Sequence, residues 1–343
     1  MGPDDVTSDW MSEVLGVEAA VVSTDRIGDG LVGMNLRVAL SGDDGVPSSV
    51  VIKLPSADPT SRATGIALRN YEREVKFYLE VATTVEIRVP HCFHGAWDEK
   101  SGDFVLVLED MAPAEVGDQV AGCAALTAGI AVAELARLHG PRWDDPTLDE
   151  LDWLTRRTGP DDVAQLAGLW EMFYPPFLAT YRRHLTPEAE ELATAFGPRL
   201  GAWMDGRVGP RAVTHGDYRL DNLLFGTAAG GPPVTAVDWQ TPGHGAPVAD
   251  LSYFCGAGLL PAERRTHERA LVELYGRSLA ELSVDVDGGW LWEQYRRDAF
   301  AGVIMAVIAS QIVGESERSE AMFAAMATRH LQHALDLDSL AAI

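Results

Sequence analysis

The stretch VTHGDYRLDNLLF, residues 213–225, constrains this chain more than any other. His215, Asp217 and Asn222 stand there in an otherwise apolar run, with four residues between the acid and the amide. A further acid, Asp238, follows sixteen residues after Asn222 inside the apolar run VTAVDW. Burying such groups is costly unless they find partners, so their role goes beyond packing. The sequence therefore predicts that the two stretches meet in one polar site, which most of the chain serves to hold.

The residue types in these stretches suit phosphoryl transfer, which needs positioning, neutralised phosphate charge and a carboxylate beside the attacking hydroxyl. Asp217 is predicted to be the base, and Asn222 and Asp238 are predicted to supply oxygen ligands to Mg²⁺. A glycine-containing turn at 226–231 predicts a hairpin that brings these two ligands together. His215 is predicted to orient the loop. For each residue alone, a turn cap or a satisfied core histidine is the competing interpretation.

A glycine pattern near the N-terminus offers a second functional signal. Gly28, Gly30 and Gly33 form G-x-G-x-x-G after an expected strand. A plain glycine hairpin is one interpretation, and a dinucleotide-binding turn is another, but that turn must open a helix. Here a β-prone segment, 34–40, follows instead. Strand, glycines and strand are typical of a flap over ATP phosphates, where missing side chains let the backbone approach the ligand.

One lysine, Lys53, lies within the apolar strand SVVIKLP. It belongs either at an exposed sheet edge or inside, paired and bound to phosphate, and the V-x-I-K form favours the second interpretation. A helix is expected over residues 64–81, with Glu72 and Glu74 both bordering its apolar face. Either glutamate could reach the lysine, or both could be solvated. Periodicity alone does not choose between them.

The chain divides by its patterning into two lobes of an α+β protein. Residues 1–111 predict a five-stranded antiparallel sheet with one important helix, ending in a polar linker at Glu109, Asp110 and Met111. Residues 112–343 predict a larger, mainly helical lobe. Its helices are expected to begin near residue 124 and to span 163–184, 187–205, 261–282, 289–313 and 316–337.

Composition excludes several classes of partner. The 343 residues carry a net charge of −24 and no cluster of Lys and Arg, which disfavours nucleic acid and anionic membranes. The acidity either suits a cationic or neutral substrate or simply maintains solubility. There is no apolar run of ~18 residues and no signal peptide, and three separated cysteines indicate a cytoplasmic protein. The sequence also lacks a Gly-Lys-Ser/Thr phosphate loop.

The motifs HGDYRLDNLLF, VDWQTPGHGAPVADLSYF and FVLVLEDM together resemble the aminoglycoside phosphotransferase and choline-kinase-like superfamily. In these motifs the chain is most similar to the ecdysteroid-kinase-like branch. The resemblance covers nearly the whole chain and implies a bilobal, protein-kinase-like fold. It also implies an ATP- and Mg²⁺-dependent transfer of the γ-phosphate to a hydroxyl of a small molecule.

The resemblance carries roles onto individual positions of this chain. Asp217 matches the catalytic base, and Asn222 and Asp238 match the metal ligands. Lys53 matches the lysine on the α- and β-phosphates, and Glu74 matches its partner. The remaining matches are the flap glycines Gly28, Gly30 and Gly33, the adenine-holding hinge Glu109, Asp110 and Met111, and the loop-bracing residues His215 and Asp250. Arg219 is a candidate to neutralise the transferred phosphate, with a surface salt bridge as the competing interpretation.

Other functions remain open at this stage. One is a catalytically silent kinase-fold protein that binds a nucleotide or ligand, and another is an aminoglycoside kinase. Protein kinase activity is disfavoured because no Ala-Pro-Glu segment follows Asp238. Aromatic residues of the C-terminal helices are candidates for the acceptor pocket, with core packing as the alternative: Trp290, Trp292, Tyr295 and Phe300. The motifs specify neither the acceptor nor the oligomeric state.

Overall fold

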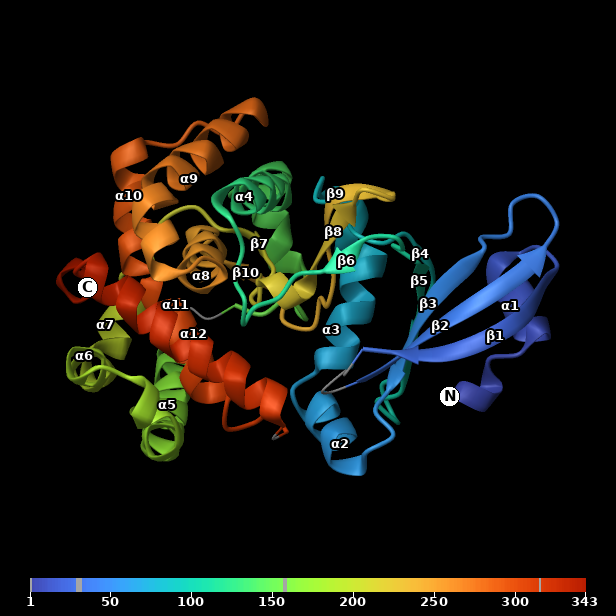
Figure 1. The fold of residues 1–343 in the computed structure, drawn as a ribbon, viewed down its shortest axis with the longest axis horizontal. Helices are drawn as coiled ribbons and strands as arrows, with labels where there is room; N and C mark the ends of the chain where they lie inside the picture. Colours follow the sequence, from blue (N-terminus) through green and yellow to red (C-terminus); the bar gives the residue numbers. More distant parts are fainter. Residues whose placement is uncertain (1, 29–32, 157–158, 315) are drawn as a thin grey trace.

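The computed structural model describes residues 2–28, 33–156, 159–314 and 316–343. Its N-terminal lobe contains an antiparallel five-stranded sheet in the order β1-β2-β3-β5-β4, which confirms the predicted sheet (Figure 1). The strands are β1 (Ala19–Ile27), β2 (Gly33–Gly42), β3 (Ser49–Pro55), β4 (Cys92–Trp97) and β5 (Phe104–Glu109). The helices of this lobe are α1 (Ser8–Leu15), α2 (Pro59–Ala67) and α3 (Asn70–Lys76).

Alternation along β3 decides where Lys53 points. Val50, Ile52 and Leu54 are buried in the apolar cluster that also contains Met11 of α1. Because successive side chains of a strand point to opposite faces, Lys53 projects to the other side of the sheet. That side is the one against which α3 packs, since residues of α3 share a core with Phe104, Leu106 and Leu108 of β5. The strand pattern therefore brings the lysine under α3.

The single helix expected over 64–81 is wrong in one respect: α2 and α3 are separate helices. Arg69 stands between them with a φ of 58°, a left-handed conformation that a helix cannot continue through. Its guanidinium then pairs with Glu72, with Nε at 2.7 Å from Oε2 and Nη2 at 2.8 Å from Oε1. A π-helical turn, Phe77–Val81, follows α3. Within α3, beyond the break, Glu74 is fully buried.

The ion pairs of Glu72 predict an acid-sensitive contribution to stability. Hydrogen bonds from Arg69 lower the pKa of Glu72 to about 2, with Lys76 adding to the effect and burial opposing it. A lowered pKa in the folded state stabilises the protein above about pH 4.5, and this stabilisation is lost as the pH falls towards 2. Because Arg69 is about half exposed, Glu72→Gln is expected to cost only about 1–2 kcal/mol at pH 7.

Urea unfolding of this variant at pH 7, 5 and 3 measures the effect. The loss relative to the native protein is expected to shrink as the pH approaches 2. Glu99→Gln removes the same charge at an exposed position of the β4–β5 hairpin, where the described residues offer Glu99 no ion pair, and serves as the control. If Glu72→Gln had the native stability at pH 7, the pair would contribute nothing.

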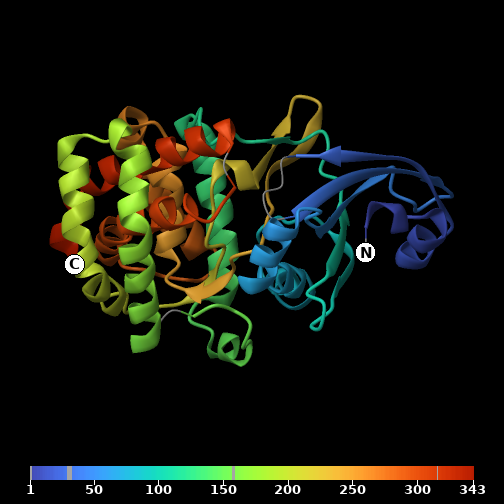
Figure 2. The same ribbon diagram turned by 90° about the horizontal axis from the view of Figure 1, so that it is seen from below.

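The C-terminal lobe is larger and mainly helical, as predicted (Figures 1 and 2). Its helices are α4 (Ala125–His139), α5 (Pro160–Tyr181), α6 (Pro187–Phe196), α7 (Leu200–Asp205), α8 (Val248–Gly258), α9 (Pro261–Glu281), α10 (Gly288–Arg297), α11 (Ala299–Ala309) and α12 (Glu317–Asp336). Its short strands are β6 (Glu115–Val116), β7 (Ala212–Thr214), β8 (Leu223–Thr227), β9 (Gly230–Ala236) and β10 (Gly243–Gly245).

Two expected helices prove to be pairs, and one helix was not foreseen. The segment 187–205 divides into α6 and α7 at a 3₁₀ turn that contains Pro198, which lacks the N–H that an α-helix requires. The segment 289–313 divides into α10 and α11 at Asp298. Helix α8 was missed because nearly every residue in it is buried, so it shows no polar face and no helical periodicity.

One continuous core joins the lobes. Tyr71, Val75 and Phe77, from α3 and the turn after it, belong to the same buried cluster as the helices of the C-terminal lobe. Figure 2 shows α3 between the sheet and those helices. None of the helices in the described residues has the length and apolar character needed to cross a bilayer. The predicted lobe boundary after residue 111 stays a prediction.

Candidate active site

The predicted polar site is built on a hairpin. Strands β8 and β9 pair antiparallel, with Leu223 opposite Ala236, so the residues just outside that pair also meet. The amide of Val237 donates to the carbonyl of Asn222 at 3.0 Å. Asn222 and Asp238 are thus brought together at one end of the hairpin, as the turn at 226–231 suggested. Asp238 has a φ of 66°, an uncommon conformation for a residue other than glycine, of the kind that clusters at functional sites.

The loop between β7 and β8 carries Asp217, whose carboxylate has three donors. Tyr253 of α8 donates its hydroxyl to Oδ1 at 2.6 Å. Asn222 Nδ2 lies 2.9 Å from Oδ2, and Arg219 Nε lies 3.1 Å from the same oxygen. The side chain of Asp217 remains 22% exposed, so the carboxylate is anchored without being sealed off. This combination suits a group that must contact an exchanging ligand.

His215 is fully buried and holds the loop through both ring nitrogens. Nδ1 lies 3.3 Å from the backbone N–H of Asp217, so it accepts and carries no proton. Nε2 then carries the proton and donates it to the carbonyl of Val237 at 3.0 Å. The imidazole therefore ties the loop to the segment that leads into Asp238. This geometry matches the orienting role expected of His215.

Asp250, near the start of α8, contacts the backbone of the same loop. The N–H of His215 donates to its Oδ2 at 2.6 Å, and the N–H of Gly216 donates to its Oδ1 at 3.1 Å. His139 Nε2 lies 3.4 Å from Oδ2 on the far side. Gly216 has a φ of 79°, and a Cβ there would lie 2.3 Å from the carbonyl oxygen of Thr241, so only glycine fits.

Removing the carboxylate of Asp250 is expected to destabilise the protein. In Asp250→Ala, the two N–H groups of the loop lose their acceptors in a buried place, which costs about 2–4 kcal/mol in the free energy of unfolding. Asp250→Asn keeps one acceptor oxygen and should lose less. Urea unfolding measures both variants, with the exposed Asp285→Ala as the control. Equal stability of Asp250→Ala and the native protein would rule out the bracing contact.

Lys53 joins the two lobes at this site. Its Nζ contacts Glu74 of α3 and lies 3.1 Å from Oδ1 of Asp238. Burial acts to lower the pKa of Lys53, but the two carboxylates outweigh it and the pKa is raised, so the side chain stays charged. Burial likewise acts to raise the pKa of Asp238, but the attraction of Lys53 prevails and the pKa is lowered. The structure places Glu74, and not Glu72, against the lysine.

Asn222 and Asp238 have oxygens of the kind that Mg²⁺ prefers. The amide nitrogen of Asn222 is committed to Asp217, which orients its carbonyl oxygen as the ligand atom. The side chain of Asp238 is 37% exposed and can accept a metal as well as the lysine. Within the described ranges, no three His, Cys, Asp or Glu side chains group as a metal cage. A Mg²⁺ ion that keeps waters and binds substrate phosphates fits such a donor set.

Arg219 does not form the exposed surface salt bridge that was the competing interpretation. Its side chain is only 13% exposed, with Nε on Asp217 and Nη1 2.6 Å from Oδ2 of Asp221. Burial acts to lower the pKa of Arg219, but the carboxylates of Asp217 and Asp221 outweigh it, and the pKa is raised above its ordinary value. The guanidinium therefore stays charged beside Asp217. Its role toward a phosphate stays a prediction.

The remaining predicted residues lie in the N-terminal lobe. Gly28 follows β1 and Gly33 begins β2, while Gly30 lies outside the described residues. At the predicted hinge, Glu109 pairs with Arg88 at 2.7 Å, Asp110 pairs with Arg37 at 2.8 Å, and Met111 is buried. These side chains brace the segment. Part of its backbone is also engaged, because the N–H of Glu109 donates to the carbonyl of His91 at 2.8 Å and the carbonyl of Met111 accepts from the N–H of Ala114 at 2.9 Å.

Two aromatic residues that were not among the predicted site residues also belong to the site. Trp239 is fully buried, and its ring is stacked on that of Phe77 with centroids 3.7 Å apart. The ring of His215 lies at 4.4 Å, tilted by 45°. It therefore links the turn after α3 to the loop that carries Asp217. Tyr253, which donates to Asp217, comes from α8, and no local spacing relates residue 253 to residue 217. For Trp239, the sequence did offer a signal, namely its position directly after the predicted metal ligand Asp238.

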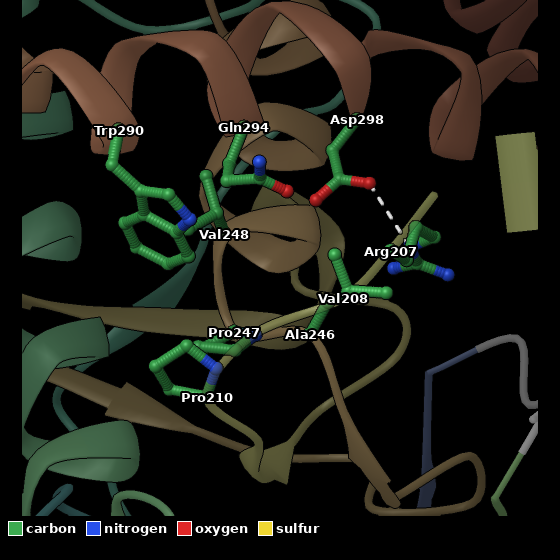
Figure 3. Close-up of a pocket in the computed structure, with 9 residues that line it drawn as sticks. All are labelled: Arg207, Val208, Pro210, Ala246, Pro247, Val248, Trp290, Gln294 and Asp298. Atoms are coloured by element: carbon green, nitrogen blue, oxygen red, sulfur yellow. Dashed lines mark ion pairs between the residues drawn. The ribbon is translucent and has the colours of Figure 1, made fainter. Parts of the chain in front are cut away.

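A small cavity lies elsewhere in the C-terminal lobe and contains none of the predicted site residues. Figure 3 shows Arg207 and Asp298 forming an ion pair at its edge, 3.0 Å apart, with Trp290 at its other end. Of the aromatic residues considered for an acceptor pocket, Trp290 lines this cavity. Tyr295 and Phe300 are fully buried and belong to the core. For these two, the core interpretation is correct.

Known proteins resemble this chain both in sequence pattern and in fold. A sequence model of the phosphotransferase enzyme family matches residues 35–284. No curated protein sequence matches the chain. Among solved structures, the chain is similar to a Ralstonia eutropha protein provisionally described as an aminoglycoside phosphotransferase. The two are 18% identical, with 96% of this chain and 97% of the other covered and a TM-score of 0.56.

Two further structures share the architecture. The GDP complex of aminoglycoside 2′-phosphotransferase-IIIa is 13% identical, with 85% of this chain and 87% of the other covered and a TM-score of 0.56. The ethanolamine kinase of Plasmodium vivax is 11% identical, with 88% and 80% covered and a TM-score of 0.52. At these identities the likeness shows the fold. It confirms the bilobal, protein-kinase-like architecture expected from the motifs.

Proposed function

The chain belongs to the phosphotransferase enzyme family, and on that basis we propose that it is a kinase that transfers the γ-phosphate of Mg-ATP to a hydroxyl of a small molecule. The observation that carries this proposal is the meeting of two lobes at one point. Lys53, from the sheet, contacts Asp238 at one end of the β8–β9 hairpin. Asn222 lies at the same end of the hairpin and donates to Asp217. This arrangement supplies a cation, metal-ligand oxygens and a base within one site.

Each residue has a defined task in this proposal. Lys53 binds the α- and β-phosphates and is oriented by Glu74. Asn222 and Asp238 hold Mg²⁺, which when bound neutralises phosphate charge. Asp217 accepts the proton of the attacking hydroxyl as its oxygen bonds to the γ-phosphorus and the bond to the leaving ADP breaks. Arg219 adds positive charge beside the base.

The nucleotide is proposed to lie between the glycine flap and the hinge. Gly28 and Gly33 flank the flap, and a Cβ at Gly33 would lie 3.2 Å from the carbonyl oxygen of Leu54. The side chains of Glu109 and Asp110 are already paired, so the adenine would be received by the backbone groups of the segment 109–111 other than the bonded N–H of Glu109. The flap backbone would then cover the phosphates.

Two features bear on the class of acceptor, and they favour different classes. A net charge of −24 favours a cationic acceptor, and structural neighbours include a kanamycin complex and an ethanolamine kinase. The motifs most similar to ecdysteroid kinases favour a neutral or apolar alcohol. Both classes place a hydroxyl at Asp217. The acceptor is therefore proposed to be a small molecule with a hydroxyl group, and a screen identifies which molecule it is.

The test is ADP release from Mg-ATP in the presence of a panel of acceptors. The panel contains kanamycin, streptomycin, ethanolamine, choline, a fructosamine and a hydroxylated steroid, with each omitted in turn. We expect one class to stimulate ADP release well above the rate with no acceptor. A thermal shift with Mg-ATP but no stimulation by any acceptor would favour a silent nucleotide-binding protein. Absence of both responses would reject the proposal.

A further inference from the structure

Helix α8 contacts the loop of Asp217 at two points from one of its faces. Asp250 and Tyr253 are three residues apart, a spacing that places both side chains on the same side of a helix. Asp250 accepts the backbone N–H groups of His215 and Gly216. The hydroxyl of Tyr253 reaches the side chain of Asp217 itself, 2.6 Å from Oδ1. The helix thus holds both the backbone of the loop and its functional carboxylate.

We propose that Tyr253 is a positioning residue that determines which oxygen of Asp217 receives the proton of the acceptor hydroxyl. This inference rests on the proposed kinase function and adds a role that the sequence motifs did not indicate. It follows from the number of hydrogen bonds that the carboxylate accepts and from the way Tyr253 is held.

A carboxylate offers about four acceptor directions, two on each oxygen. On Asp217, Oδ2 already accepts from Asn222 at 2.9 Å and from Arg219 at 3.1 Å. Oδ1 accepts only from Tyr253 among the described residues. The remaining direction therefore belongs to Oδ1, beside the tyrosine hydroxyl. The side chain as a whole is 22% exposed, so a ligand can reach the carboxylate.

The chemical step is balanced at this oxygen. The acceptor hydroxyl donates to Oδ1, its oxygen forms a bond to the γ-phosphorus, and the bond from that phosphorus to ADP breaks. The proton ends on Oδ1, and Tyr253 keeps its own proton throughout. Tyr253 thus limits the rotation of the carboxylate and keeps Oδ1 turned toward the substrate.

Tyr253 is itself held as a fixed donor. Its side chain is 5% exposed, and its ring stacks on that of His330 with centroids 5.1 Å apart and planes 16° apart. Burial raises the pKa of Tyr253 well above its ordinary value, and the negative charge of Asp217 raises it further. The phenol therefore remains protonated wherever the enzyme is folded. Its hydroxyl can act only as a donor toward the carboxylate.

The test is Tyr253→Phe, which removes one oxygen and keeps the ring. With an acceptor found by the screen, or with water as the acceptor of Mg-ATP hydrolysis, we expect kcat to fall about 10-fold while KM for Mg-ATP stays unchanged. Tyr295→Phe is the matched control, since its buried hydroxyl donates to another carboxylate, Glu268, at 3.2 Å.

A second readout does not depend on turnover. The carboxyl ¹³C resonance of Asp217, assigned by its loss in Asp217→Asn, should shift at pH 7 in Tyr253→Phe but not in Tyr295→Phe. Incorporation of 3-fluorotyrosine at position 253, a stronger donor in a native-like fold, should shift it in the opposite direction. An unchanged resonance in both Tyr253 derivatives, or a kcat of Tyr253→Phe equal to that of the native protein, would overturn the inference. If the wild-type protein showed no turnover, the kinase proposal would be rejected. The resonance would then still show whether Tyr253 donates to Asp217.

Discussion

Asp217→Asn is expected to lower kcat for phosphoryl transfer by about 10²–10⁴-fold while the affinity for Mg-ATP is retained. Asparagine has the same size as aspartate and keeps one oxygen to accept from Tyr253 or Asn222. It cannot take the proton of the acceptor, however, and it removes the charge that pairs with Arg219. A loss confined to kcat is the signature of an interaction made in the transition state.

Steady-state kinetics with the acceptor identified by screening measures this loss, and titration with Mg-ATP measures binding. Asp221→Asn is a matched control, because Asp221 lies in the same loop and also pairs with Arg219, at 2.6 Å. It should cost less than about 10-fold, because it leaves the proton acceptor in place. If Asp217→Asn transferred phosphate at the native rate, the base would have to be another group.

Lys53→Met is expected to lower the free energy of unfolding by about 3–5 kcal/mol and to weaken the binding of Mg-ATP. Glu74 has no exposed surface, so loss of the ammonium leaves a buried carboxylate without its counter-charge. Removing one partner of a buried pair costs far more than removing both. The double variant Lys53→Met/Glu74→Gln should therefore recover much of the lost stability.

The double variant separates stability from function. We expect it to unfold near the native urea midpoint and still to bind Mg-ATP poorly, because the phosphate-binding cation is missing. Arg265→Met removes a cation from the pair with Asp336, where the arginine is 49% exposed, and should change stability by less than about 1 kcal/mol. A double variant no more stable than Lys53→Met would show that Glu74 is not the group left uncompensated.

The parts of the fold that follow from short-range pattern were predictable from the sequence. Alternation identified the strands and placed a lysine inside one of them, and a glycine-containing turn indicated the hairpin that joins Asn222 to Asp238. The break at Arg69 was not predictable, because its left-handed conformation depends on the ion pair with Glu72 and on the packing of α3. Helix α8 was not predicted, because it is buried on all sides and its sequence lacks the alternation of apolar and polar residues that indicates a helix.

The candidate site divides in the same way. Asp217, Asn222 and Asp238 could be grouped because they lie close together in the chain and have unusual polarity for their surroundings. The choice of Glu74 over Glu72 needed a resemblance, and the structure now supplies the contact with Lys53. Tyr253 could not be found at all, since an aromatic in an apolar helix is ordinarily core. Only tertiary contact distinguishes it from its neighbours.

The hairpin that holds Asn222 and Asp238 also bears on the order in which the protein assembles. Asp217 and Asn222 are five residues apart, whereas Lys53 and Asp238 are separated by 185. Local contacts close with little entropy loss, and distant ones wait for the intervening chain. During synthesis the pair of Lys53 and Glu74, 21 residues apart, can form while Asp238 has not yet left the ribosome. Because α3 shares one core with the helices of the C-terminal lobe, the contact of Lys53 with Asp238 has to wait for that lobe, and we expect it to be among the last contacts of the site to form.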